Sequence, residues 1–125
     1  MPVAPGLTAA VEHVVTEGDT AVAHRSGDVA VLSTPRIVAL VEEAAMAALK
    51  GRLKATETSV GHTVQLDHVA PSAVGAEVRA EVTLAKVEGR RLIFAVSVSD
   101  ARGLVAVGRL TRVVVDVERF LDRTH

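Results

Sequence analysis

The sequence predicts an α+β fold in which one long helix packs against an antiparallel sheet. Two observations indicate this fold: an alanine-rich stretch with helical periodicity, and four later stretches that alternate apolar and polar side chains. Short turns join the four stretches, and strands joined by short turns pair as antiparallel neighbours. A helix and a sheet that are each apolar on one side bury those sides against each other.

The composition limits the classes of function. At 125 residues with 49% hydrophobic residues, residues 1–125 are expected to form one domain. The net charge of −1 gives no electrostatic reason to expect binding to nucleic acid or to an anionic membrane. The absence of cysteine excludes disulfides, thiolate metal ligands and a cysteine nucleophile. Neither a secretion signal nor a membrane-spanning segment is predicted, so a cytoplasmic protein is expected.

The helix is predicted within "STPRIVALVEEAAMAALKG", residues 33–51. Thr34 is expected to cap its N-terminus, with Pro35 at the first helical position and Gly51 at its end. On a helical wheel, Glu42 lies at about 140° from Ile37, beside an apolar stripe centred at about 40°. Its neighbour in the sequence, residue 43, lies at about 240° among charged side chains. We therefore expect Glu42 to border the buried face and Glu43 to be solvated.

The strands are predicted at residues 58–70, 76–87, 91–99 and 104–117, and residues 7–15 form a weaker candidate that could complete the sheet. Strict alternation along residues 58–70 places His62 and His68 on one face with aliphatic side chains, and Gly61 on the opposite face. The two histidines are then about 20 Å apart along the strand, too far to bind one zinc ion. No metal site is predicted.

Five residues stand at informative intervals: Thr34 at the helix start, Glu42 eight residues later, Gly61 and His68 in the next strand, and Arg112 in the last strand. In this pattern, and in the hairpin "VEGRRL", the sequence resembles the fluoroacetyl-CoA thioesterase family over roughly residues 7–122. The resemblance implies a hot-dog fold and a homodimeric hydrolase of acyl-CoA thioesters. It also implies Thr34, Glu42 and His68 as the catalytic set, with Gly61 and Arg112 in the substrate site.

For three of these residues the sequence allows a purely structural role as well as the catalytic one, and it does not decide between the two roles. A hydroxyl at Thr34 can cap the helix, but the same helix end also favours a thioester oxyanion. Glu42 is either a solvated carboxylate on the helix flank or, where partly desolvated, a base or nucleophile. His68 is either a strand-end histidine bonded to backbone or a proton-transfer partner of Glu42.

The remaining candidates are Gly61 and three arginines. Gly61 marks either a bulge or a place where a thioester carbonyl approaches the backbone. Arg112 shares its strand face with a leucine and a valine, so its charge needs a carboxylate, a ligand or an edge position, unless its stem simply packs at the surface. Arg90 and Arg91 in the hairpin are either solvated turn residues or contacts to CoA phosphates.

The chain departs from the family in the segment before Thr34. The fluoroacetate-resistance enzymes carry aromatic residues there that close over a very small acyl group, whereas "HRSGDVAVLST" contains none. Selectivity for fluoroacetyl-CoA is therefore not expected, and a more open pocket should accept other short acyl groups. Because the CoA thiolate is a good leaving group, no metal or other cofactor is expected.

Other functions remain open from the sequence. Glu42 could attack the carbonyl or deprotonate a water, and the sequence does not separate these routes. A hydratase or dehydratase of acyl thioesters would need an acid and a base above the substrate, but Asp67 and His68 are adjacent in a strand and face opposite ways. Two further alternatives are not enzymes: a non-catalytic acyl-CoA binding or sensing module, and a purely structural protein.

Overall fold

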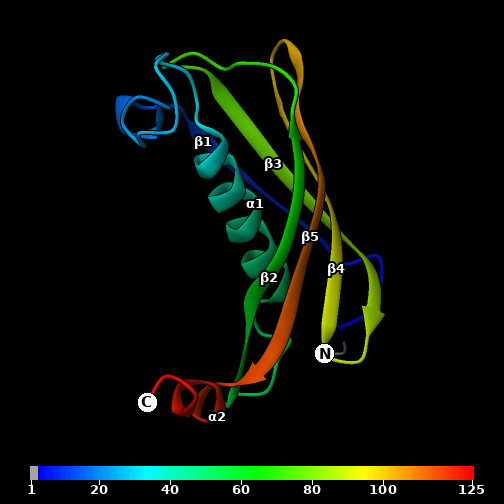
Figure 1. Ribbon diagram of the computed structural model, residues 1–125. Coiled ribbons are helices and arrows are strands. Elements are labelled where there is room, and N and C mark those ends of the chain that lie inside the picture. Colours follow the sequence, from blue (N-terminus) through cyan, green and yellow to red (C-terminus); the bar gives the residue numbers. More distant parts are fainter. Residues whose placement is uncertain (1–2) are drawn as a thin grey trace.

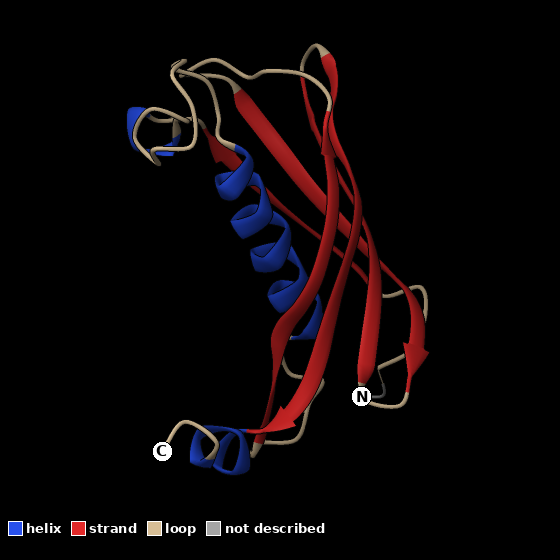
Figure 2. Ribbon diagram, in the orientation of Figure 1, coloured by secondary structure: helices blue, strands red, loops and turns tan. Residues whose placement is uncertain are grey.

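Five antiparallel strands form one curled sheet, and a long helix lies across its concave face in the computed structural model, which describes residues 3–125 (Figures 1 and 2). The strands are β1 (Thr8–Val14), β2 (Glu57–His68), β3 (Glu77–Glu88), β4 (Arg91–Asp100) and β5 (Gly103–Asp116). The helices are the 3-10 helix η1 (Glu17–Asp19), α1 (Thr34–Leu49) and the short α2 (Val117–Asp122). The predicted α+β architecture is confirmed, whereas η1 and α2 were not predicted.

The strand order is β1-β3-β4-β5-β2, so β3, β4 and β5 form a meander as predicted. The expectation that residues 58–70 pair with residues 76–87 was wrong, because β2 pairs with β5 instead. Two-residue turns join them: Glu88 pairs with Arg91, and Asp100 pairs with Gly103. Gly89 lies in the first turn with a φ of 62°, a conformation that glycine adopts without strain. The weaker strand candidate is β1, which pairs with β3 at one edge, and β2 forms the other edge.

The core lies between α1 and the concave face of the sheet. The helix buries one stripe: Ile37, Leu40, Val41, Ala44, Ala45, Ala48 and Leu49. Three of these are alanines, whose small side chains let the helix axis lie close to the strands. On the strands, alternate residues such as Leu84 and Phe94, both 0% exposed, fill the opposite side. Each such side chain contributes about 1.5–3 kcal/mol through its burial.

The start of α1 differs from the prediction, because Ser33 and not Thr34 is the N-cap. Ser33 has an extended backbone, and its hydroxyl accepts a hydrogen bond from the Arg36 backbone N–H at 3.0 Å. Serine caps a helix as well as threonine does, and here it is the residue just outside the first turn. Thr34 is therefore the first helical residue, and its hydroxyl is not used for capping.

A β-bulge in β2 overturns the predicted division of its faces. Gly61 pairs with Arg112 and Thr63 pairs with Thr111, so His62 between them is an extra residue without a partner on β5. An extra residue inverts the alternation of side chains beyond it. Gly61 before the bulge and His68 after it therefore share the concave face, and the prediction that they lie on opposite faces was wrong. His62 does not share the face of His68.

Within residues 3–125, no helix has both the length and the apolar character needed to cross a lipid bilayer.

Candidate active site

The first pair of candidate residues forms where α1 begins beside the end of β2 (Figure 1). Thr34 Oγ1 lies 2.8 Å from His68 Nδ1, within hydrogen-bonding distance. The other ring nitrogen, Nε2, is buried and has no hydrogen-bond partner among the described residues. Since buried polar atoms are nearly always hydrogen-bonded, this nitrogen is available to a ligand, a water or a reacting group.

The second pair, Glu42 and Arg112, lies further along α1. Arg112 Nη1 donates to Glu42 Oε2 at 3.1 Å, and the two side chains are 7% and 36% exposed respectively. Burial lowers the pKa of Arg112, and the charge of the Glu42 carboxylate opposes that change. Of the alternatives that the sequence left open for Arg112, the structure shows a carboxylate partner, which is Glu42. The wheel prediction is also confirmed, because Glu42 is half-buried and Glu43 is exposed.

Ser59 and Met46 hold the rest of the Arg112 guanidinium. Nε donates to the Ser59 hydroxyl at 2.8 Å, Nη2 donates to the Ser59 carbonyl at 2.9 Å, and Nη2 also lies 3.3 Å from Met46 Sδ. Sequence analysis missed Ser59, because strict alternation put it on the opposite face from His68. We call Glu42, Arg112, Ser59 and Met46, together with the adjacent Gly61, the Glu42 cluster.

Gly61 lies directly beneath the carboxylate. A Cβ atom added at Gly61 would collide with Glu42 Oε2 and would lie 3.8 Å from Arg112 Nη1. No side chain fits between the strand and the carboxylate, so glycine is what lets Glu42 approach the sheet. From the sequence, Gly61 was a place where a thioester carbonyl could approach the backbone. In the structure, the Glu42 carboxylate itself partly fills that space.

The two pairs lie on one side of the molecule but do not touch. Thr34 and Glu42 are eight residues apart, which is about 12 Å along the helix axis. Helical side chains lean toward the N-terminus, so Glu42 leans toward Thr34 and narrows this gap. Within residues 3–125, the recorded hydrogen bond of the Glu42 carboxylate involves Oε2 only. Among the described residues, neither Glu42 Oε1 nor His68 Nε2 has a recorded hydrogen bond.

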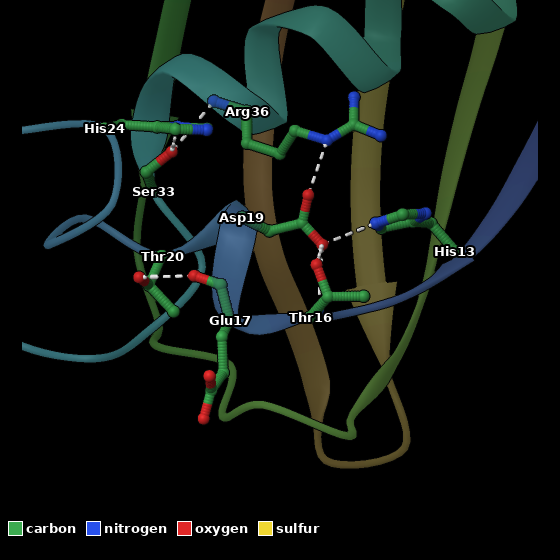
Figure 3. A network of polar contacts seen from close by, with 8 residues as sticks. All are labelled: His13, Thr16, Glu17, Asp19, Thr20, His24, Ser33 and Arg36. Carbon is green, nitrogen blue, oxygen red and sulfur yellow. Dashed lines mark hydrogen bonds and ion pairs between the residues drawn. The ribbon is translucent and has the colours of Figure 1, made fainter.

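A separate network anchors the N-terminus of α1, and Figure 3 shows its residues. Asp19, with a side chain 10% exposed, accepts hydrogen bonds from His13 Nε2 at 2.7 Å and from Arg36 Nε at 2.9 Å. The backbone N–H and the hydroxyl of Thr16 add bonds of 2.7 and 2.9 Å. We call these four residues the Asp19 cluster.

The hydrogen bonds of the Asp19 cluster also decide the charge of its carboxylate. Burial alone would raise the pKa of Asp19, but the hydrogen bonds from Thr16, His13 and Arg36 outweigh burial and hold it well below its usual range. The backbone of Ser33 donates to the Asp19 carbonyl at 3.0 Å. Asp19 thus binds residues on both sides of Thr34, which fixes where the helix starts.

Sequence analysis assigned no role to His13 or His24, and both serve this end of the helix. His13 contacts Asp19, and His24 Nδ1 contacts the hydroxyl of the helix cap Ser33 (Figure 3). No motif could have revealed these contacts, because they depend on how separate segments of the chain pack together. Among residues 3–125, no group of three or more His, Cys, Asp or Glu side chains is arranged to hold a metal ion.

The structure separates the two hairpin arginines. Arg90 Nη1 lies 3.2 Å from Glu57 Oε2 and 3.2 Å from the Val114 carbonyl. Arg91 instead lines a groove with Lys86 and Arg109. Arg91 and Arg109 alternate with buried or half-buried residues in their strands and so face away from α1. The two hairpin side chains, Arg90 and Arg91, therefore line different cavities.

Comparison with known proteins gives a consistent result. A family model described as fluoroacetyl-CoA-specific thioesterase matches residues 15–118, a range that contains all five principal candidates. The fluoroacetyl-CoA thioesterase of Streptantibioticus cattleyicolor is 33% identical over 90 residues. That match covers 72% of this chain and 65% of the relative's length.

Solved structures agree over almost the whole chain. The structure of the fluoroacetyl-CoA thioesterase FlK superposes with a TM-score of 0.94 at 26% identity, covering 99% of this chain and 96% of the other. A hot-dog-like protein from Thermanaerovibrio acidaminovorans gives a TM-score of 0.90 at 29% identity, covering 96% and 89% of the two chains. Other structures of FlK mutants hold fluoroacetate with CoA, or acetyl-CoA. The predicted hot-dog fold is therefore confirmed.

Proposed function

The chain belongs to the fluoroacetyl-CoA-specific thioesterase family, and on this premise we propose that it hydrolyses acyl-CoA thioesters to a free acid and CoA. The family is one of thioester hydrolases by description, and the named relatives are thioesterases. The observation that carries the proposal is the Glu42 carboxylate, held by Arg112 in a space that only glycine at position 61 leaves open. A solvated surface glutamate would need neither the buried arginine nor the glycine.

The proposed substrates are short acyl-CoA thioesters, of which acetyl-CoA is bound to a mutant of the related FlK. Residues 24–34, which lead to Thr34, contain no aromatic side chain that could close over a very small acyl group. We therefore propose that the chain does not select fluoroacetyl-CoA over other short acyl groups. A series of acyl-CoA chain lengths tests this directly.

In the proposed reaction the acyl carbonyl lies between Glu42 and the Thr34–His68 pair. Glu42 takes a proton from a water, the water oxygen adds to the carbonyl carbon, the C–S bond breaks, and the departing CoA thiolate receives the proton. Alternatively, Glu42 itself adds to the carbonyl and expels the thiolate, and water then opens the resulting anhydride. A single turnover in ¹⁸O-labelled water that leaves label on Glu42 identifies the second route, because only attack of water on the Glu42 carbonyl carbon of the anhydride puts label there.

His68 and Thr34 support the charge that develops on the carbonyl oxygen. The hydrogen bond between Thr34 and His68 Nδ1 fixes the orientation of the ring, and the unpartnered Nε2 is then able to donate to the oxyanion or to transfer a proton. Thr34 stands in the first turn of α1, where the helix dipole also favours negative charge. Gly61 and Arg112 hold the Glu42 carboxylate in place beside the substrate.

We also propose that the chain acts as a homodimer with the site near the subunit interface. Strand β2 is a 12-residue edge strand, and long unprotected edges tend to pair with another chain. Val64 on this strand is 39% exposed, and a second copy would cover it. Light scattering at low micromolar concentration should report a dimer, and a stable monomer would refute this part of the proposal.

The neighbouring glutamates provide the test of the enzymatic function. Glu42→Gln should lower thiol release from butyryl-CoA by more than about 100-fold, whereas Glu43→Gln should leave it unchanged. The chain has no cysteine, so a thiol reagent detects only the CoA that is released. Thermal unfolding of both variants shows whether each is folded. If the parent protein binds butyryl-CoA but releases no CoA, the chain is a binding module and the proposal is wrong.

A further inference from the structure

A groove runs from the Glu42 cluster toward the C-terminal end of α1. It has a volume of about 520 Å³ and lies between the second half of α1, the loop that follows it, and the first residues of β2. Its wall includes Met46 and Ser59, the same residues that contact the Arg112 guanidinium. The groove is therefore continuous with the Glu42 cluster, on the side away from Thr34 and His68.

The groove changes character along its length. Near the Glu42 cluster, Met46 and Leu49 make its wall apolar, and Leu53 continues that wall beyond the helix end. At its far end stand Lys50 and Lys54, which are both exposed and make no ion pair within residues 3–125. The ligand that fits such a groove is a slender, mostly uncharged chain that ends in an anion.

The charged side chains around the far end of the groove also favour a ligand that ends in an anion. The one carboxylate in the groove wall, Glu57, is paired with Arg90 at 3.2 Å. Arg90 lines an adjoining cavity of about 480 Å³ that also includes Arg52 and shares Lys54 and Glu57 with the groove. The far end of the groove thus gathers four cations around a single carboxylate, which favours a multiply charged anion.

We propose that this groove, the carrier groove, holds the pantetheine arm of CoA, and that Lys50 and Lys54 bind the phosphate groups at the end of that arm. This inference rests on the proposed function, since it assumes that the thioester lies at Glu42. The dimensions agree: Lys50 is eight residues beyond Glu42, or about 12 Å along the helix. A pantetheine arm is about as long as four to five extended residues, or about 15 Å.

Three butyryl thioesters that release a free thiol test the two parts of the inference. Butyryl-CoA has the arm and the phosphates, S-butyryl-pantetheine has only the arm, and S-butyryl-N-acetylcysteamine has neither phosphates nor most of the arm. The variant Lys50→Ala/Lys54→Ala should raise KM for butyryl-CoA about tenfold with kcat unchanged. Its KM for the other two thioesters should not change.

A second variant tests the arm by filling the groove. Ala47 is exposed, lines the groove and is not among the residues that contact Arg112. Ala47→Trp should raise KM for butyryl-CoA and S-butyryl-pantetheine, and leave the N-acetylcysteamine thioester unaffected. If Ala47→Trp instead changes the preferred acyl length among N-acetylcysteamine thioesters, the groove holds the acyl group and the inference is wrong.

The matched control is Lys86→Ala/Arg109→Ala, which removes the same charge from the opposite face of the sheet. It should leave all three KM values unchanged, and an equal rise in KM for butyryl-CoA in the control would show a general charge effect and overturn the inference. Calorimetric titration with CoA alone separates this inference from the proposed function. Should the parent release no thiol, the lysine variant must still weaken CoA binding about tenfold. Unchanged affinity would refute the carrier groove by itself.

Discussion

The Glu42 cluster and the Asp19 cluster each contain a carboxylate paired with an arginine near α1, but the two carboxylates differ in exposure and in the number of hydrogen bonds that they accept. Arg36 of the helix itself binds Asp19, and Arg112 of strand β5 binds Glu42. Asp19 is 10% exposed and accepts bonds on both oxygens from Thr16, His13 and Arg36. Glu42 is 36% exposed, and Arg112 binds only one of its oxygens.

The difference separates a structural carboxylate from a reactive one. The hydrogen bonds to Asp19 hold its pKa well below the usual range despite its burial, so it stays ionised and does not exchange protons near neutral pH. Glu42 makes its recorded hydrogen bond through Oε2 only, and the Nε2 nitrogen of His68 has no partner among the described residues. Substitutions in the Glu42 cluster and the Thr34–His68 pair should therefore lower turnover, and those in the Asp19 cluster should lower stability.

Matched glycine substitutions give the largest contrast between the two regions. Gly61→Ala places a methyl group where Glu42 Oε2 now lies, so the carboxylate must move away from the strand. Turnover should fall about 100-fold, because small displacements of a reacting group are costly. Gly18→Ala, beside Asp19, adds a Cβ that meets only Thr16 Oγ1 at 3.7 Å and should keep full activity. Equal rates for the two variants would show that the approach of Glu42 to the strand is irrelevant to turnover.

Two adjacent hydroxyls sharpen the contrast at the helix start. Thr34→Ala should lower turnover at least tenfold with little change in unfolding free energy, because the Thr34 hydroxyl contacts His68 and not the helix backbone. Ser33→Ala removes the cap and should lower the unfolding free energy by about 1 kcal/mol. Urea unfolding and thiol release on both variants measure the pair, and Thr34→Ser should restore activity. A destabilised but fully active Thr34→Ala would reverse these assignments.

Asp19→Asn should have a smaller effect on turnover and a clear one on stability. The lowered pKa means that, as pH falls, the unfolded chain takes up the proton before the folded one does. The contribution of Asp19 to stability is thus complete above the usual aspartate pKa of about 3.9 and is lost as pH falls below it. Asp19→Asn should lower the unfolding free energy at pH 7 by about 2 kcal/mol and reduce this loss in acid. An unchanged acid profile would mean that Asp19 is not the group responsible.

The sequence predicted the parts of the fold that periodicity encodes. Helical spacing placed Glu42 at the border of the buried stripe, and short turns identified the meander, because both signals are local. The N-cap was misassigned because Ser33 and Thr34 are both suitable caps, and only the backbone conformation decides between them. The bulge at His62 was missed because one extra residue leaves the polar and apolar pattern on each side intact.

The Asp19 cluster could not have been predicted from spacing at all. Its members come from β1, η1 and the first turn of α1, and the irregular chain between them carries no periodicity. Arg112 marks the intermediate case. An arginine on an apolar strand face left a carboxylate, a ligand, an edge position or a packed stem as alternatives, and only the fold identified Glu42 as the partner.

Two histidines on the strands that flank α1 test the central claim most directly, because His68 contacts Thr34 and His13 contacts Asp19. His68→Ala should lower thiol release from butyryl-CoA by about two to four powers of ten with little change in melting temperature. His13→Ala, which removes one donor to Asp19, should lower the melting temperature and keep kcat. A folded His68→Ala variant that releases CoA at the parental rate would contradict the account, since the site would then work without the side chain that, within residues 3–125, has a buried nitrogen with no hydrogen-bond partner.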